Sequence, residues 1–414
     1  MISSIVDTKK GRIGGIAMDG CVVYRGIRYA KAPVGELRFK APVETDAWEG
    51  VYEAIRWGNI SPQADLADMP LYGREFYSQP EFTAPCDEDC LFLNIWTPAD
   101  SKGKKLPVAF WIHGGAFDHG WGFELEFDGA SFCRQNVILV TINYRVGVLG
   151  FLAHSWLSER ENGRSGNYGC LDQIAALKWV RDNIEAFGGD PDNITVFGQS
   201  AGCMSAQVLT STDLTRGWIS KCILQSAPAY PSPMLSGGTL AEAEEKGAAL
   251  IRNAGISSLE ELLAVPASVL VKAQQEAGVM LPPVIDGFVQ TASGEKLLEE
   301  GHFHDIPYMA GCTADDIFGD DCRKLVSAWC AKKAEKGTTP VYQYFFRRAL
   351  PGDDAGSFHS AELWYVFGTL KRCWRPMTEA DEALSCRMVS AWTSFMKTGT
   401  PGWDAAPFTE VLDI

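Results

Sequence analysis

A serine with a glycine two residues away on either side is the strongest chemical signal in this sequence. Ser200 lies in Gly198-Gln199-Ser200-Ala201-Gly202, after an apolar run at residues 194–197 and before the helix-compatible residues 203–206. A serine on a sharp turn from a strand to a helix needs small neighbours at these positions, because the backbone is strained and the flanking elements nearly touch. The pattern predicts Ser200 as a nucleophile above a helix N-terminus; a chance match in a glycine-rich chain is the alternative.

Consecutive small residues also follow a second predicted strand. Residues 110–117 read Phe-Trp-Ile-His-Gly-Gly-Ala-Phe. Such residues leave backbone N–H groups free to face a developing oxyanion, and each such donor contributes several kcal/mol in the transition state. We expect an oxyanion hole made by the N–H groups of Gly115, Ala116 and Ala201, although the glycines could instead form only a turn. His113 is interpreted as a structural histidine that orients this loop, not as a base.

Strands that alternate with helices must hold these groups in place. β-branched or aromatic runs occur at residues 107–112, 137–143, 194–198, 222–225, 307–311 and 341–346, and helical periodicity at residues 169–186 and 384–397. This order predicts an α/β fold with a mostly parallel central sheet and helices on both faces. Residues 13–28 alternate through glycine-rich turns, which indicates an antiparallel edge at the N-terminal side.

Composition limits the partners. The chain has 414 residues with 37 Lys and Arg against 52 Asp and Glu, a formal charge of −15. This balance argues against nucleic acid, because a phosphate backbone needs a basic face. We expect a single domain over residues 1–414, with loop or cap elements around residues 59–87, 118–128 and 229–285.

Targeting segments, membrane spans and metal sites are not predicted. The first ten residues lack a basic end followed by an apolar stretch, so we expect no signal peptide and a cytoplasmic protein. The most apolar region, residues 137–153, is interrupted by polar side chains and is too short to span a bilayer. Twelve scattered cysteines are interpreted as buried thiols, and no second cysteine pair or histidine cluster at a zinc spacing accompanies Cys86 and Cys90.

Longer motifs resemble a known family. Residues 187–202 match, without a gap, the serine signature of type-B carboxylesterases, the cholinesterase-like branch of the α/β-hydrolases, and residues 88–98 match that family's second signature. Residues 24–39 resemble the family's N-terminal strand and turn, and the similarity runs from about residue 10 to the end. The resemblance implies an α/β-hydrolase fold and hydrolysis of a small-molecule carboxylic ester through an acyl-enzyme intermediate, with no cofactor.

The resemblance also implies the partners of Ser200. The family's acid follows a strand in a pattern like G-x-T-x-D-E, which reads Gly-Cys-Thr-Ala-Asp-Asp at residues 311–316 and places Asp316 at the acid position. Asp stands where Glu is usual, and Asp315 or Asp320 remain competitors. His359 matches the catalytic histidine and the aromatic stretch that trails it. The other histidines outside the oxyanion loop lack this context: His119, His154, His302 and His304.

Supporting residues follow from the same comparison. Ser226 matches a buried serine that supports the histidine in this family, although it could equally cap the next helix. Gly114 and Gln199, which adjoin the oxyanion loop and the serine, complete the supporting set. Three further residues match a buried ion-pair cluster and are interpreted as structural, because an unpaired buried Glu88 would cost several kcal/mol: Arg38, Glu88 and Arg145.

Departures from the family bear on the substrate. Neutral Gln199 precedes the serine, no Trp lies between Trp57 and Trp96, and no cysteine lies suitably upstream of Cys90 to close a loop, which together argue against a choline ester. The interval from Asp316 to His359 is shorter than is typical of the family.

We therefore expect an open site for short-to-medium or bulky aryl esters. Its rim would be formed by residues 59–87 and 118–128, the latter with His119, Trp121, Phe123 and Phe127. The alternatives are a non-catalytic interaction domain of the same fold, and an amidase or thioesterase with the same triad. The sequence makes no prediction of the oligomeric state.

Overall fold

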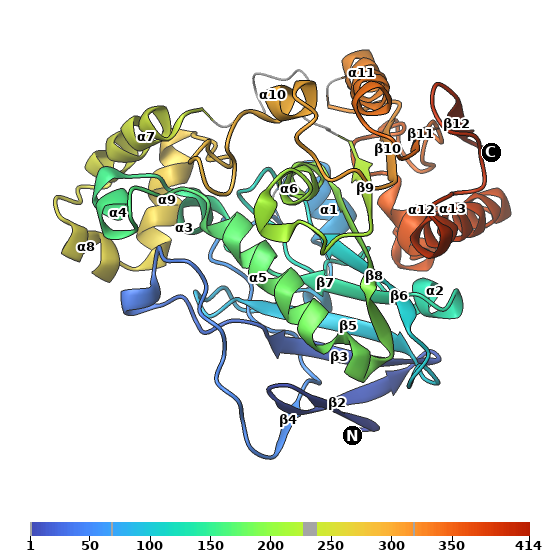
Figure 1. Cartoon of the computed structure of the whole chain (residues 1–414), viewed down its shortest axis with the longest axis horizontal. Helices are drawn as coiled ribbons and strands as arrows, with labels where there is room; N and C mark the ends of the chain where they lie inside the picture. The colour runs from blue at the N-terminus through green and yellow to red at the C-terminus, as the bar shows by residue number, and fades with distance from the viewer. Residues whose placement is uncertain (1, 68, 227–237, 318) are drawn as a thin grey trace.

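A sheet of twelve strands runs through the part of the chain that the structure describes (Figure 1). The structure is a computed structural model that describes residues 2–67, 69–226, 238–317 and 319–414, without the side chain of Asp320. The strands are β1 (Ser4–Thr8), β2 (Gly11–Met18), β3 (Cys21–Arg28), β4 (Val51–Glu53), β5 (Phe92–Pro98), β6 (Leu106–Ile112), β7 (Ile138–Ile142), β8 (Gly189–Gln199), β9 (Lys221–Gln225), β10 (Tyr308–Thr313), β11 (Val341–Phe346) and β12 (Thr409–Leu412).

Strand pairing confirms the predicted fold class. The order is β1-β2-β3-β5-β7-β6-β8-β9-β10-β11-β12, with β4 beside β2. Pairs from β7 to β12 are parallel, whereas β1, β2, β3, β5 and β7 pair antiparallel. The antiparallel edge therefore reaches further into the sheet than residues 13–28, because β5 pairs antiparallel with both neighbours.

Helices connect the strands and cover the sheet. Both predicted helices are present, as α5 (Tyr168–Asn183), which continues into the 3-10 helix η3 (Ile184–Phe187), and as α13 (Glu379–Thr398). The remaining α-helices are α1 (Tyr72–Phe76), α2 (Ala130–Arg134), α3 (Gly147–Phe151), α4 (Ser155–Arg160), α6 (Ala201–Leu209), α7 (Leu240–Asn253), α8 (Leu259–Ala264), α9 (Ala267–Ala277), α10 (Gly294–Glu299), α11 (Asp320–Lys336) and α12 (Leu363–Phe367). Figure 1 shows α5 and α6 crossing in front of the strands.

Each face of the sheet has its own core, because successive side chains of a strand point to opposite faces. In β6, Val108, Phe110 and Ile112 pack in one apolar cluster, and Ala109 and Trp111 pack in the other. The first cluster includes side chains of α5, α6 and α11, and the second includes side chains of α2, α12 and α13. Helices thus cover both faces, as predicted.

The sheet brings the predicted catalytic residues to one edge. The loop after β6 carries Gly115, the turn after β8 carries Ser200, and the segment after β10 carries Asp316. His359 lies between β11 and α12. Because β6, β8, β9, β10 and β11 are parallel neighbours, their carboxyl ends meet at the same edge, which is where ligands bind in open α/β sheets.

The segments predicted as loops have structure of their own. Residues 59–87 contain α1 and the 3-10 helix η2 (Pro80–Phe82), and residues 238–285 carry α7, α8 and α9. Residues 229–237 of the predicted cap lie outside the described residues. Nine cysteines are buried, as predicted, but Cys86 and Cys386 are exposed and Cys373 is half-buried.

The described residues contain neither a membrane-spanning helix nor a cluster of metal-binding side chains. No helix there is long and apolar enough to cross a membrane. Nor do three or more His, Cys, Asp and Glu side chains gather there in a way that could hold a metal ion.

Candidate active site

Ser200 occupies a strained turn between β8 and α6. Its φ of 57° and ψ of −124° lie outside the regions that most residues adopt. A Cβ on Gly202 would lie 2.0 Å from the carbonyl oxygen of Ile112, and one on Gly198 would lie 2.3 Å from the carbonyl oxygen of Gly202. The backbone N–H of Ser200 donates to the carbonyl of Gln225 at 2.9 Å. The two glycines are therefore required by the close approach of β6 to the turn.

Asp316 lies against the imidazole of His359. His359 Nδ1 donates to Asp316 Oδ1 at 2.9 Å, and Thr313 Oγ1 donates to Asp316 Oδ2 at 3.1 Å. Burial acts to raise the pKa of Asp316, but these donors and the hydroxyl of Ser226 outweigh it and lower the pKa below its usual value. The carboxylate is thus ionised, and a proton on Nδ1 leaves Nε2 as a hydrogen-bond acceptor.

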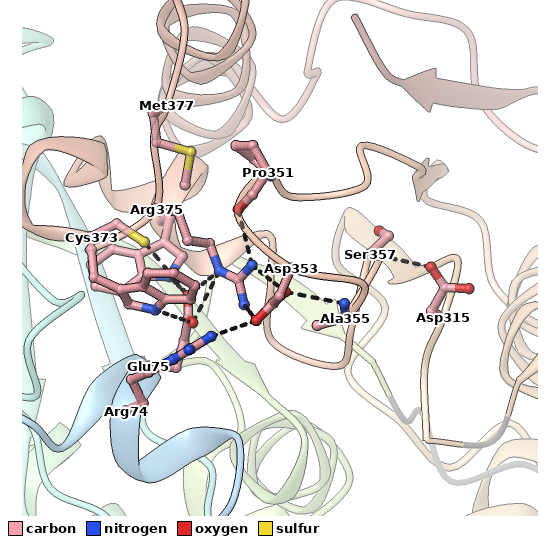
Figure 2. Close-up of polar contacts among 12 residues, drawn as sticks. Arg74, Glu75, Asp315, Pro351, Asp353, Ala355, Ser357, Cys373, Arg375 and Met377 are labelled. Atoms are coloured by element: carbon pink, nitrogen blue, oxygen red, sulfur yellow. Dashed lines mark hydrogen bonds and ion pairs between the residues drawn. The ribbon is translucent and has the colours of Figure 1, made fainter.

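Asp315 points elsewhere. Its Oδ2 accepts the backbone N–H of Ser357 at 2.7 Å, and its own N–H donates to the carbonyl of Ser357 (Figure 2). Asp315 therefore ties the acid loop to the segment just before His359. The side chain of Asp320, the other competitor, lies outside the described part of the chain.

Gln199 contacts the other nitrogen of the imidazole. Its Nε2 lies 3.1 Å from His359 Nε2, so that the amide donates to the nitrogen that faces the cavity. Ser200 and His359 line the same cavity. The sequence shows that residue 199 is neutral but not where its amide points, so the contact between Gln199 and His359 was not predicted.

The loop after β6 has the features of an oxyanion hole. Gly115 has φ 97° and Ala116 has φ 53°. A Cβ on Gly115 would lie 2.1 Å from the carbonyl oxygen of His119, so only glycine fits. Among the described residues, the N–H groups of Gly115 and Ala116 have no hydrogen-bond partner. Ala201 begins α6, where an N–H has no acceptor inside the helix.

His113 is packed beneath this loop. Its ring stacks on Tyr144 at 4.3 Å between centroids, and its carbonyl accepts the Tyr144 hydroxyl at 3.0 Å. Burial lowers the pKa of His113 to about 3, so the ring is neutral. This packing fits the structural role expected from the sequence. Of the remaining histidines, His119 lines the cavity, whereas His154, His302 and His304 do not.

The predicted ion cluster contains two neighbouring ion pairs. Arg38 Nε donates to Glu88 Oε2 at 2.7 Å, and the guanidinium makes a second contact with the same carboxylate. Arg145 pairs instead with Asp172, through contacts of 2.7 Å to each carboxylate oxygen. Arg38, Glu88 and Arg145 line one small hollow, so the three residues lie together, and Asp172 is the partner of Arg145 that the sequence did not show. Asp172 was missed because it lies 27 positions along the chain, inside a helix.

A buried glutamate behind His359 was also missed. Glu362 is fully buried and accepts the Gln225 amide at 3.3 Å, while its Oε2 has no partner in the described part of the chain. Burial raises the pKa of Glu362 to about 7, with the nearby imidazole acting in the opposite direction. Its spacing of three residues from His359, at the start of α12, is the signal that could have found it.

Ser226 is buried beside the acid. The φ of Ser226 is 51°. Its hydroxyl has no hydrogen-bond partner of acceptable geometry among the described residues. It nevertheless lies close enough to Asp316 to help lower the pKa of that carboxyl. The alternative role of Ser226 as a helix cap concerns residues 227–237, which lie outside the described part of the chain.

The cavity at Ser200 has a volume of about 230 Å³. Residues 59–87 contribute Met69, Tyr72, Phe76 and Tyr77 to its wall, and residues 118–128 contribute His119, Glu124, Glu126 and Phe127. Trp121 and Phe123, which were expected at the rim, pack instead against Ile60 and Leu66. That expectation was wrong because the two rings fill a separate apolar cluster under the loop.

A buried ion pair fixes α1 beside this cavity. Glu75 and Arg375 are both 0% exposed, and Arg375 Nε lies 3.0 Å from each Glu75 oxygen (Figure 2). The neighbours of this pair are the indole N–H groups of Trp364 and Trp374, each 2.8 Å from Glu75, and Asp353, 2.6 Å from Arg375 Nη1. Since α1 carries Tyr72 and Phe76, the pair holds part of the cavity wall.

Known proteins share this architecture. A family model described as the carboxylesterase family matches residues 2–321 and 314–410. The two matched ranges overlap at residues 314–321, around Asp316, where the interval to His359 begins. A solved structure of a PNB esterase superposes with a TM-score of 0.88 at 32% identity, covering 99% of this chain and 96% of that chain. A carboxylesterase of Geobacillus stearothermophilus superposes with a TM-score of 0.83 at 33% identity and the same coverage.

Curated relatives cover nearly the whole chain. The para-nitrobenzyl esterase of Bacillus subtilis (strain 168) is 35% identical over 470 residues, which cover 98% of this chain and 92% of that protein. The fumonisin B1 esterase of Sphingopyxis macrogoltabida is 37% identical over 95% of this chain and 82% of its own length. Human cocaine esterase is 36% identical with the same two coverages.

Proposed function

Because this chain belongs to the carboxylesterase family and is a serine carboxylic-ester hydrolase, we propose that Ser200, His359 and Asp316 carry out the hydrolysis through an acyl-enzyme intermediate. The observation that carries this proposal is the 2.9 Å contact of Asp316 with His359, whose side chain lines the same cavity as Ser200. A nucleophile, a base and a group that orients the base are the parts that acyl transfer needs.

The reaction begins at the ester carbonyl carbon. Ser200 Oγ attacks this carbon while His359 Nε2 takes the hydroxyl proton, which forms a tetrahedral intermediate and an imidazolium. Asp316 stays ionised and stabilises the imidazolium. Collapse of the intermediate breaks the bond to the alcohol oxygen, which receives the proton from Nε2. Water then attacks the acyl group through the same steps and releases the acid and Ser200.

Backbone N–H groups would stabilise the intermediate. The negative charge that develops on the carbonyl oxygen needs donors that are already oriented, and each one removed costs about 100-fold or more in rate. The N–H groups of Gly115 and Ala116 have no partner among the described residues, and with that of Ala201 at the start of α6 they support this role.

In the first step the Gln199 amide must leave His359 Nε2, so that the Ser200 hydroxyl can donate to this nitrogen. His359 Nε2 accepts the Gln199 amide at 3.1 Å, yet proton transfer requires this nitrogen to face the serine hydroxyl. A small rotation of the Gln199 side chain frees the acceptor. The amide, lining the same cavity, is then available to the bound substrate.

The substrate is a small-molecule ester, and we place it among short-to-medium or aryl esters. The cavity of about 230 Å³ is smaller than the roughly 300–1,000 Å³ of sites that enclose a drug-sized ligand. A bulky ester would therefore extend beyond the described walls. The relatives named for para-nitrobenzyl, fumonisin B1 and cocaine hydrolysis support an ester with one large group.

Hydrolysis of p-nitrophenyl acetate, butyrate and octanoate tests the proposal. Ser200→Ala should lower kcat/KM at least about a thousandfold on each ester that the wild type turns over. Ser390→Ala, which changes an exposed serine of α13, is the matched control and should behave like the wild type. A wild type no faster than Ser200→Ala would refute the assignment of Ser200.

A further inference from the structure

Two glutamates form part of the catalytic cavity, and the proposed reaction uses neither. Glu124 and Glu126 line the same cavity as Ser200 and His359. They are only 5% and 1% exposed, and their carboxyl groups lie within hydrogen-bonding reach of each other. Because they follow the oxyanion loop in the chain, the fold brings two acids to the place where a substrate must sit.

The carboxyl pair has no cation of its own. Within the described part of the chain, neither glutamate forms an ion pair. Glu124 Oε1 accepts the Trp121 N–H at 2.8 Å, whereas Glu126 Oε2 is buried without any hydrogen-bond partner. A buried acceptor left unpaired is costly. The wall of the cavity therefore contains a buried acceptor that no described group of the protein satisfies.

Aromatic rings complete the surroundings of this acceptor. Tyr72, Phe76, Tyr77 and Phe127 line the same cavity. The face of an aromatic ring attracts a cation, and the attraction grows as the cation loses water. Rings also pack well against the methylene groups of an alkyl chain. An alkylammonium group satisfies both the carboxyl pair and the rings, whereas an apolar group would leave Glu126 Oε2 unpaired.

We propose that this cavity recognises esters that carry a protonated amine, with Glu126 accepting the ammonium N–H and Glu124 supporting it. This inference rests on the proposed function, because it names the substrate class of the same site. The two glutamates bind the substrate and take no part in forming or breaking bonds.

The charge of the carboxyl pair depends on pH. Burial raises the pKa of Glu124 to about 8, with the Trp121 N–H and Glu126 acting in the opposite direction. Burial, with the charge of Glu124, also raises the pKa of Glu126. A carboxyl with a raised pKa stays protonated below that value and becomes an anion as the pH rises through it. Preference for a cationic ester should therefore grow with pH.

The other ionisable groups around the pair keep their charge over this range. Burial raises the pKa values of Tyr77 and Tyr144 well above the usual value, so both phenols stay neutral. Burial lowers the pKa of His119 to about 4, so its ring is neutral as well. Glu75 is held by the fully buried guanidinium of Arg375.

Two matched pairs of esters test the inference on the two sides of the carbonyl. On the acyl side, p-nitrophenyl 6-aminohexanoate is compared with p-nitrophenyl heptanoate. On the alcohol side, 3-(dimethylamino)propyl butyrate is compared with 4-methylpentyl butyrate in a pH-stat. Each pair has the same shape, and the amines remain protonated because alkylamines titrate near pH 10. Rates measured with Ser200→Ala are subtracted as background.

For the wild type, kcat/KM of the cationic ester should exceed that of its neutral partner by about tenfold at pH 8.5 in at least one pair. That ratio should fall by about tenfold between pH 8.5 and pH 6.5, as the carboxyl pair gains protons. Glu126→Gln should bring the ratio close to one at both pH values. Glu124→Gln provides the second variant should Glu126→Gln fail to fold.

Glu81→Gln is the control for long-range attraction, because Glu81 is an exposed acid of residues 59–87 outside the cavity. Equal loss of preference in Glu81→Gln would assign the effect to net charge and overturn the inference. So would a ratio near one in the wild type at pH 8.5, or a ratio unchanged in both cavity variants. In these cases Ser200-dependent hydrolysis of the neutral esters leaves the proposed function standing; its absence overturns both.

Discussion

Arg375→Met tests how the cavity wall is held. The variant keeps an unbranched chain but removes the guanidinium that contacts both oxygens of Glu75 at 3.0 Å and Asp353 at 2.6 Å. Glu75 and Arg375 are both 0% exposed, so water cannot replace the lost contacts. Two indole N–H groups still reach Glu75, but no other cation of the described residues forms an ion pair with it.

The expected cost follows from this burial. Removal of one partner of a buried ion pair destabilises a protein by about 3–5 kcal/mol, because the other charge stays buried without compensation. Glu75→Gln in the same chain removes that charge while an amide oxygen still accepts the indole N–H groups. The double variant should therefore recover about 2 kcal/mol or more of the loss. Arg74→Met, which removes an exposed cation from Asp353, should cost less than about 1 kcal/mol.

Equilibrium unfolding in urea, followed by tryptophan fluorescence, gives the free energy of unfolding for each variant. KM for p-nitrophenyl butyrate gives a second readout, and Arg375→Met should raise it because α1 carries Tyr72 and Phe76 to the cavity. An Arg375→Met protein within about 1 kcal/mol of the wild type would refute the reasoning. A double variant less stable than Arg375→Met alone would refute it equally.

Two further substitutions test the turn and the buried acid behind the histidine. Gly202→Ala should cost about 3 kcal/mol or prevent folding, because its Cβ would lie 2.0 Å from the Ile112 carbonyl oxygen; an unchanged urea midpoint would contradict this. Glu362→Gln should reduce kcat/KM more at pH 8 than at pH 6, by a ratio of about fivefold. Burial raises the pKa of Glu362 to about 7, so the carboxylate that favours the imidazolium of His359 forms only as the pH rises through that value. A loss equal at both pH values would speak against this role.

The sequence predicts the bounds of a strand correctly where neighbouring residues in the chain end it. Residues 341–346 are β-branched, aromatic or polar β-formers between Pro340 and Arg347, and β11 has those bounds. Strand β8 begins at Gly189, five positions before the predicted start, because Gly189 pairs with Leu106 of β6 ahead of an irregular stretch of turn-forming residues, after which pairing resumes at Ile194. Strand β5 is buried along its whole length and so shows no alternation of polar and apolar residues.

In the candidate site, too, the sequence predicts the features built from neighbouring residues and misses the contacts between distant ones. The turn at Ser200 and the loop at Gly115 are built from neighbouring residues, so their patterns are visible in the sequence. Asp315 and Asp316 are adjacent and point in different directions, and the bridge between Asp315 and Phe358 decides which of them reaches His359. Only tertiary structure contains that information, as it does the pairing of Arg145 with Asp172.

Buried carboxyl groups lie beside the imidazole or line the same cavity, and their environments give them different charges. Asp316 is the one that receives a ring N–H and a hydroxyl, and its pKa is lowered. Burial raises the pKa of Glu362 to about 7 and that of Glu124 to about 8, and it raises that of Glu126 as well. Near pH 6 the fixed negative charge beside His359 is therefore on Asp316, the residue that must stabilise the imidazolium. Glu362, Glu124 and Glu126 become ionised only when the pH rises or when a bound ligand donates hydrogen bonds to their carboxyl groups.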